Sequence, residues 1–285
     1  MNSSIVLITL IAYKLVLIGI GFWAQKRTHS REDFFLGGRQ LGPVIAAISY
    51  SASSASAWTL LGMSGLAYSI GLPALWLAAG AILGSVVAWL WIAPRLMARS
   101  QAQQQLTLTD FIADQTSPKE SLPLKRLASG IILFSFVFYI SSQFQGAGNT
   151  FASTFDISMA SSIIIGGVII VLYTLLGGFW AVIVTDTLQG FLILGAAVLL
   201  PSAAWIEVGG WQGIRTFMEE EQLTHLLSLT REHGGLSAVG FIVGSLAVSV
   251  GTYGQPHLLN RFMALRDTRA LKQAQVIAIV WFSLV

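Results

Sequence analysis

The chain has 285 residues, of which 54% are hydrophobic and only 10% charged, with a formal net charge of +3. Soluble domains carry about 25% charged residues, so this composition excludes an ordinary soluble protein and predicts an integral membrane protein. The lack of cysteine excludes disulfide bonds, thiol catalysis and cysteine-bound metals, and the basic residues form no patch typical of nucleic-acid binding.

Apolar stretches of about 20 residues recur along the sequence, each long enough to cross a bilayer. They lack the alternating pattern of a membrane barrel, so we expect an all-α integral membrane protein. No basic region precedes the first stretch and no cleavage site follows it, which favours a retained helix over a signal peptide. We expect a single membrane domain over 1–285 with spans at 5–24, 42–70, 74–93, 127–148, 161–178, 187–206 and 236–257, and a partial span from residue 274.

The basic residues predict how these spans are oriented. Most of the sixteen lysines and arginines fall in loops near 25–40, 94–126 and 260–273, which alternate crossings place on one side. Basic loops are usually cytoplasmic, so we expect the amino terminus outside. The loop at 207–235 then lies outside; its acidic residues are Glu207, Glu219, Glu220, Glu221 and Glu232.

The second span is unusual at its centre. From Ser49 to Ala57 it contains no Leu, Ile, Val or Phe, only small residues, five serines and one tyrosine. Serine hydroxyls compete with the helical hydrogen bonds, and non-helical backbone at membrane depth is tolerated only inside protein or beside a wet cavity. We therefore predict a broken helix whose carbonyls and hydroxyls hold a cation and a solute.

A second interruption lies five crossings later, where Gly251, Gly254 and Pro256 fall inside the span at 236–257. Proline in a helix removes a backbone bond. Paired interrupted spans in two halves of a chain indicate a transporter binding site, although Gly and Pro also simply kink membrane helices. The spacing predicts inverted repeats, the first at 42–206 and the second starting at 236–285, with 5–24 as an extra helix.

Four motifs carry a resemblance: FFLGGRQLGP (34–43), ISYSASSASAW (48–58), GGFWAVIVTDTLQG (177–190) and GQPHLLNRFMA (254–264). They resemble the sodium:solute symporter family, most closely its sodium/proline branch. The resemblance implies an inverted-repeat (LeuT-like) core of ten helices, here with its second repeat incomplete. It also implies a non-enzymatic protein of a bacterial-type plasma (inner) membrane that imports a small organic solute, such as proline, together with Na⁺.

The resemblance further implies roles for single residues. Backbone carbonyls of Ala52 and Ala55 face the sodium ion, and hydroxyls from a later helix, outside this sequence, complete the site. Asp186 lies on the sodium exit route. The solute-facing positions are Ser56, Ala57, Trp58, Tyr139 and Thr252. No oligomeric state follows from the sequence.

Departures from the family pattern leave alternatives open. Ser54 stands where the proline carriers have an aspartate, and Val248 and Thr252 stand where they have aromatic residues. The chain could instead be a transporter-like sensory input domain of a signalling kinase, or an inactive truncated fragment. A kinase domain after Val285 would favour sensing, and further spans alone would favour transport. Lys14, in the middle of the first span, has no role in any of these readings.

Overall fold

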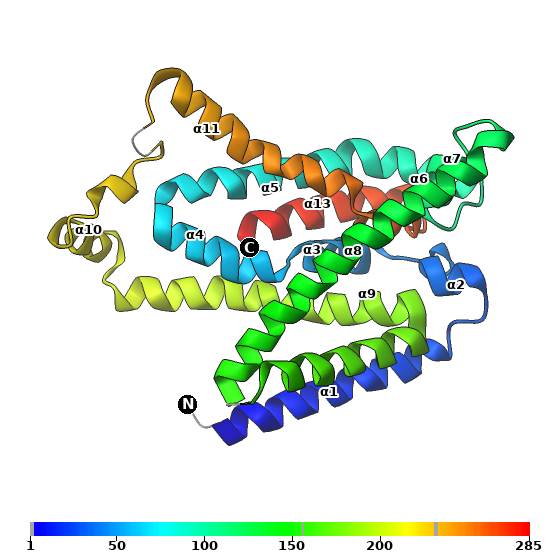
Figure 1. Ribbon diagram of the computed structural model, residues 1–285, viewed down its shortest axis with the longest axis horizontal. Coiled ribbons are helices and arrows are strands. Elements are labelled where there is room, and N and C mark those ends of the chain that lie inside the picture. Colours follow the sequence, from blue (N-terminus) through cyan, green and yellow to red (C-terminus); the bar gives the residue numbers. More distant parts are fainter. Residues whose placement is uncertain (1–2, 156, 231–232) are drawn as a thin grey trace.

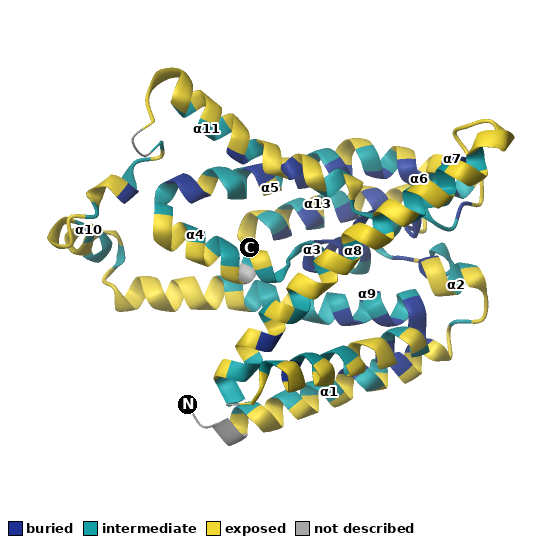
Figure 2. Ribbon diagram, in the orientation of Figure 1, coloured by how far each residue is buried: buried dark blue, intermediate teal, exposed yellow. Residues whose placement is uncertain are grey.

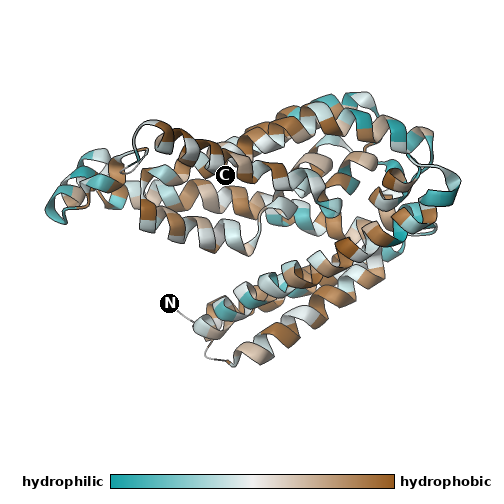
Figure 3. Cartoon of the chain, turned by 45° about the horizontal axis from the view of Figure 1, so that its top comes forward, coloured by the Kyte–Doolittle hydropathy of each residue, from teal (hydrophilic) through white to brown (hydrophobic). Residues whose placement is uncertain are grey.

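The computed structural model describes residues 3–155, 157–230 and 233–285, and every named element within them is helical. Five of these helices are long and apolar enough to cross a membrane. Apolar residues cover the long helices along most of their length, whereas hydrophilic residues gather toward the ends of the molecule (Figure 3). The prediction of an all-α membrane protein is confirmed.

The first helix, α1 (Ser3–Gln25), leads into a segment predicted as a loop that contains the short helix α2 (Arg31–Leu36) and a 3₁₀ turn. Ser30 begins α2 with a capping box, in which its hydroxyl accepts from the Asp33 N–H and the Asp33 carboxylate accepts from the Ser30 N–H. These bonds hold the pKa of Asp33 below its ordinary value.

The span from residue 42 to 70 is broken, as predicted. It consists of α3 (Pro43–Ser54) and α4 (Met63–Ile70), separated by non-helical residues Ala55 and Ser56 and a wide π turn at Trp58–Gly62. Ala55 has extended backbone angles (φ −73°, ψ 112°). The break therefore falls inside the run of small residues that the sequence singled out.

The predicted end of the next span at residue 93 was wrong. After α5 (Leu75–Val87) and a π turn at Ala88–Ile92, the helix continues as α6 (Ala93–Ala102). Pro94 stands in the first turn of α6, directly after the π turn, where the widened backbone accommodates a residue without an N–H. The following loop contains α7 (Leu108–Ala113).

The next three predicted spans form two long elements. α8 (Pro118–Phe155) extends beyond both predicted ends, and α9 (Met159–Glu207) includes the two spans predicted at 161–178 and 187–206. The chain reverses at Gly178 (φ 54°, ψ −141°), so the first half of α9 runs beside α1 and the second half returns (Figure 1). A Cβ atom at Gly178 would lie 2.7 Å from the ring of Phe34, so only glycine fits this reversal.

The predicted outer loop is partly helical, with α10 (Gly210–Glu220) and a 3₁₀ turn at Thr224–Leu227. Trp76 of α5 ties this segment to the core because its Nε1–H donates to the Leu229 carbonyl (2.9 Å). Glu232 of the predicted acidic set lies outside the described residues.

The second broken helix begins as α11 (Gly235–Ala247), tightens into a 3₁₀ stretch at Val248–Gly254, and resumes as α12 (Pro256–Met263). Pro256 stands at the first position of α12, where its missing N–H is not needed. The helix therefore ends at residue 263 rather than 257. The last helix, α13 (Thr268–Leu284), starts earlier than the predicted residue 274 because Asp267 caps it, accepting from the Ala270 N–H (2.7 Å).

The two broken helices share one core. Tyr50 of α3 stacks on Phe262 of α12 with ring centroids 5.0 Å apart, and Trp89 packs edge-on against Phe262 at 4.7 Å. Buried residues gather on α3, α5 and α13 in the middle of the molecule (Figure 2). The segments next to the two helices are also joined, because Leu41 donates to the Ala264 carbonyl (3.1 Å) and accepts from the Arg266 N–H (3.2 Å).

Candidate functional site

Neighbouring side chains accept hydrogen bonds from the backbone N–H groups that follow the first break. The Ser56 N–H donates to Thr59 Oγ1 (3.2 Å), and the Ala57 N–H donates to Gln143 Oε1 of α8 (2.7 Å). N–H groups at the start of a helix have no partner within it. Thr59 and Gln143 supply these partners, so the break is a defined structure.

The residues that precede the break, at the end of α3, present oxygen atoms. The Ala55 N–H is shared between the carbonyls of Ser51 and Ala52, each at 3.2 Å, and the Ser54 hydroxyl donates to the Ser51 carbonyl (2.6 Å). The Ala52 carbonyl has two lone pairs, so one remains for another ligand. Hard cations such as Na⁺ prefer carbonyl and hydroxyl oxygens of this kind.

Ser54 does not extend the site in the way an aspartate would. Its hydroxyl donates back to its own helix, a bond that serine commonly makes in helices. The oxygen atoms that α3 presents at this break therefore come from carbonyls and hydroxyls.

A cavity of about 230 Å³ adjoins the first break. Trp58 and Thr252 both line it, together with Ala55 and Thr59, so the two broken helices contribute side chains to the same space. The indole of Trp58 lies over Gly62, where a Cβ atom would be only 2.8 Å from the ring. Two of the predicted solute-facing residues, Trp58 and Thr252, are thus brought together.

Tyr139 lies in a different cavity, of about 240 Å³, beside the second break. Its ring centroid is 5.7 Å from that of His257, and Phe136 packs edge-on against the same imidazole at 5.3 Å. The structure places Ser56 and Ala57 at the first break and Tyr139 beside the second. The predicted solute-binding set is therefore divided between the two breaks.

A buried ion pair joins the two broken helices. Arg261 of α12 donates through Nη2 to Asp186 Oδ2 of α9 and to Ser53 Oγ of α3, both at 2.5 Å. Ser53 Oγ in turn donates to Asp186 Oδ2 (2.5 Å), and Arg261 Nη1 donates to the His257 carbonyl. The side chains of Arg261 and Asp186 are 3% and 17% exposed, so both charges are withdrawn from water and depend on each other.

Sequence reasoning missed Arg261 and Ser53. It assigned Arg261 to the basic loop at 260–273, whereas the structure places this residue inside α12. The available signal was its position between the apolar pairs Leu258–Leu259 and Phe262–Met263, because a charge within a membrane segment is usually functional and paired. Only the arrangement of α3, α9 and α12 shows which residues are the partners.

Arg39 holds the far end of α12 in place. Its Nε lies 2.6 Å from Glu32 Oε1 of α2, and its Nη1 and Nη2 donate to the carbonyls of Met263 (3.2 Å) and Gln105 (2.8 Å). Carbonyls at a helix end have no partner within the helix. Arg39 therefore links α2, the loop before α7 and the end of the second broken helix.

These features define a class of protein. Two interrupted membrane helices that share a core, a polar break and a small central cavity are the arrangement of an inverted-repeat transporter. The chain matches the sodium:solute symporter family over residues 34–285. It belongs to that family.

Two of its relatives are proline transporters. The chain is 38% identical over 278 residues to the osmoregulated proline transporter OpuE of Bacillus subtilis, covering 97% of this chain and 55% of that protein. It is 34% identical over 279 residues to a sodium/proline symporter of Staphylococcus aureus, covering 97% and 53%. The chain thus spans about half the length of the curated relatives it matches.

A solved structure shares the fold. The substrate-bound, outward-open state of a Na⁺-coupled sialic acid symporter superposes with a TM-score of 0.80, covering 96% of this chain and 57% of that one. At 17% sequence identity, this likeness concerns the fold alone. It supports the predicted inverted-repeat architecture for this multi-pass membrane protein.

Proposed function

We propose that this chain forms the first part of a sodium-coupled importer of a small organic solute, an amino acid such as proline. The observation that carries the proposal is the cavity beside the first break, which side chains of both broken helices line. Family membership and the two proline-transporting relatives support the choice of ion and solute. The chemistry is binding and release, with no catalytic step.

In this proposal the two cargoes bind at adjacent parts of the first break. The carbonyls of Ala52 and Ala55 face Na⁺, and ligands from residues outside this sequence complete its coordination. The solute lies against Trp58, with Thr252 opposite on the second broken helix. Ser56 and Ala57 present their backbone at the same point, and Tyr139 closes the neighbouring space beside the second break.

The ion pair of Arg261 and Asp186 forms the inner barrier. We take the basic loops near 25–40, 94–126 and 260–273 as cytoplasmic and the amino terminus as outside. Arg261 stands two residues before Met263, whose carbonyl Arg39 of the first basic loop holds. The ion pair therefore lies between the breaks and the cytoplasm, and a cation leaving inward passes Asp186.

Uptake in proteoliposomes tests this function. We expect an inward sodium gradient to raise the initial uptake of radiolabelled proline at least tenfold over an equal concentration of potassium. Trp58→Ala should abolish this stimulated uptake, because the indole forms one wall of the cavity. The matched control is Trp211→Ala, which removes an exposed indole from α10 and should leave uptake unchanged. Uptake that is equal with and without the gradient would refute coupling.

A second candidate function is solute sensing without transport. It is favoured by Ser54, whose hydroxyl turns back onto α3 where the proline carriers have a carboxylate. A sensor would bind proline in equilibrium dialysis, with or without sodium, and show no gradient-driven uptake. A Ser54→Asp variant that gains sodium-driven uptake would support this alternative.

A further inference from the structure

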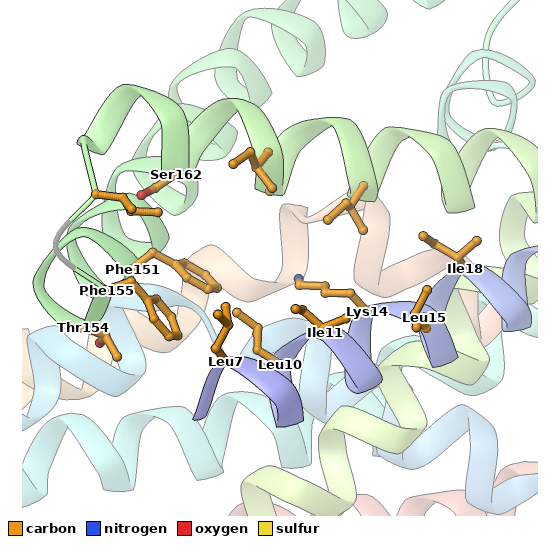
Figure 4. Close-up of a pocket in the computed structure, with 14 residues that line it drawn as sticks. Leu7, Leu10, Ile11, Lys14, Leu15, Ile18, Phe151, Thr154, Phe155 and Ser162 are labelled. Carbon is orange, nitrogen blue, oxygen red and sulfur yellow. The ribbon is translucent and has the colours of Figure 1, made fainter. Parts of the chain in front are cut away.

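A third cavity lies away from both breaks, between α1 and the first half of α9 (Figure 4). Its volume is about 680 Å³, and the end of α8 closes one side with Phe151 and Phe155. Apart from Lys14, Thr154 and Ser162, every side chain that lines it is apolar. This is a hydrocarbon-lined space of the size of a ligand pocket, and neither the solute site nor the ion pair uses it.

Lys14 is the only cation among the residues that line this cavity. It stands midway along α1 (Ser3–Gln25), and its ammonium points into the cavity (Figure 4). A charged lysine at the centre of a membrane helix costs about 2.5–3.5 kcal/mol. Such residues usually face a cavity and pair with an opposite charge, so Lys14 calls for an anion.

The described part of the chain supplies no such anion. No described carboxylate lines the cavity, and no ion pair among the described residues includes Lys14. The Lys14 ammonium lies 5.8 Å from the ring centroid of Tyr13, at the outer limit of a cation–π contact. The hydroxyl of Tyr13 accepts from Gln189 (2.7 Å). Since no described residue supplies the counter-charge, we look for it in a bound molecule.

The apolar walls of the cavity and the depth of Lys14 in the membrane indicate the chemical class of that molecule. A long apolar wall binds a hydrocarbon chain, at about 25 cal/mol per Å² buried. The ammonium lies near mid-bilayer, about 15 Å from either interface of a hydrocarbon layer about 30 Å thick, which is too deep for the headgroup of a diacyl phospholipid. A carboxylate is the smallest anionic head that can pair with an ammonium there.

We propose that this cavity binds a long-chain fatty acid, with its carboxylate on Lys14 and its acyl chain along α1 and α9. Access from the lipid is lateral, because Leu15 and Ile165 line the cavity and yet are 63% and 57% exposed, on helices that cross the membrane. The site is independent of the proposed transport function. A fatty acid there would connect the extra helix α1 to the helix that carries Asp186.

Photolabelling of the full chain in nanodiscs tests the site, with a diazirine-bearing palmitic acid as the probe and mass spectrometry to locate the adducts. We expect adducts on residues of α1, α8 and α9 that line the cavity. Excess palmitic acid should displace the probe, whereas hexadecanol, which has the same chain and no charge, should not. Equal displacement by both would overturn the pairing with Lys14.

Two variants act on separate parts of the site. Lys14→Met removes the charge, and Gly166→Leu fills the cavity at a position where a Cβ atom meets nothing within 4 Å. Each should reduce labelling at least tenfold, and Lys14→Arg should keep it. Matched controls are Lys26→Met at the exposed end of α1 and Gly195→Leu, where a Cβ atom also meets nothing within 4 Å; both should label like the original chain.

The remaining outcomes also decide the proposal. Labelling that persists in both Lys14→Met and Gly166→Leu would refute the site. Displacement by phosphatidylglycerol but not by palmitic acid would show that a phospholipid is the ligand, and would equally refute it. Asp156, next to Phe155 in sequence, lies outside the described residues; Asp156→Asn should leave labelling unchanged, and a tenfold rise would show that the chain supplies its own counter-charge.

Discussion

The two broken helices reach the same discontinuity by different means. In the first, serine and alanine fill the positions around the break, and the freed N–H groups of Ser56 and Ala57 depend on acceptors from Thr59 and Gln143. In the second, a 3₁₀ stretch leads into Pro256, which begins α12 without an N–H that needs a partner. The conformation of the first break therefore depends on a side chain from another helix, whereas the glycines and proline of the second break largely determine its conformation.

This difference indicates which of the two breaks can change its conformation when a solute binds. A break held by side chains from another helix can change when that helix moves, whereas a break fixed by glycine and proline keeps its form. The proposed cargoes bind at the first break, and the second contributes Thr252 to the same cavity. Solute binding would therefore act first on the contact between the first break, at Ala57, and Gln143 of α8.

The largest expected effect concerns the ion pair that joins the two broken helices. Arg261→Met leaves the buried Asp186 carboxylate without its cation, so we expect a loss of about 3–5 kcal/mol in unfolding free energy. Thermal unfolding in detergent measures this loss. The double variant Arg261→Met with Asp186→Asn should recover most of it, because neither charge then remains alone.

The matched control for this prediction is Arg215→Met. It breaks the exposed pair with Glu219 (2.8 Å) on α10, and surface pairs contribute at most about 1 kcal/mol. If Arg261→Met proved as mild as Arg215→Met, packing and the backbone bonds of Leu41 would join the two broken helices without help from the ion pair.

A smaller effect is expected at the first break. Gln143→Leu removes the acceptor for the partly buried Ala57 N–H; a fully buried unpaired donor costs about 1–3 kcal/mol, so we expect a loss toward the lower end of that range. We expect lower thermal stability and weaker proline binding, measured on the same preparation. Gln115→Leu, which removes an exposed amide that donates to the Phe111 carbonyl, is the control. Unchanged binding in Gln143→Leu would mean that the small residues alone hold this break open.

The smallest effect concerns the support at the end of the second broken helix. Ser30→Ala removes the cap of α2, the helix whose Glu32 orients Arg39, and should cost about 1 kcal/mol at pH 7. The Ser30 hydroxyl lowers the pKa of Asp33. The stabilisation is therefore present above the ordinary aspartate value of about 3.9 and is lost as pH falls through the lower, folded-state value.

Thermal unfolding at pH 7 and at pH 3 measures this dependence. The difference between the original chain and Ser30→Ala should shrink at the lower pH, because the pH then falls toward the lowered folded-state pKa of Asp33. Ser69→Ala, which removes an exposed hydroxyl bonded to the Gly65 carbonyl, should show no such pH dependence. A constant difference for Ser30→Ala would mean that the carboxylate takes no part in the cap.

The sequence predicted both breaks, because small residues and proline act on the local backbone. It did not predict the ion pair or its hydroxyl partner, since Arg261 is 75 residues from Asp186 and 208 residues from Ser53, and only the folded arrangement of α3, α9 and α12 brings the three together. Gln143 was missed for the same reason. The helix ends near Pro94 and Asp267 were misplaced, because a π turn and an aspartate cap extend the helices beyond their apolar residues.

The backbone bridge between Leu41 and Leu265 has a mechanical consequence. It joins the segment just before α3 to the segment just after α12 through main-chain bonds, and such bonds do not depend on which side chains are present. The start of α3 and the end of α12 are thereby held together by backbone hydrogen bonds. Any relative motion of the two helices would pivot about this point, so the displacement would grow with distance from it and be greatest at the opposite ends, where α4 and α11 lie.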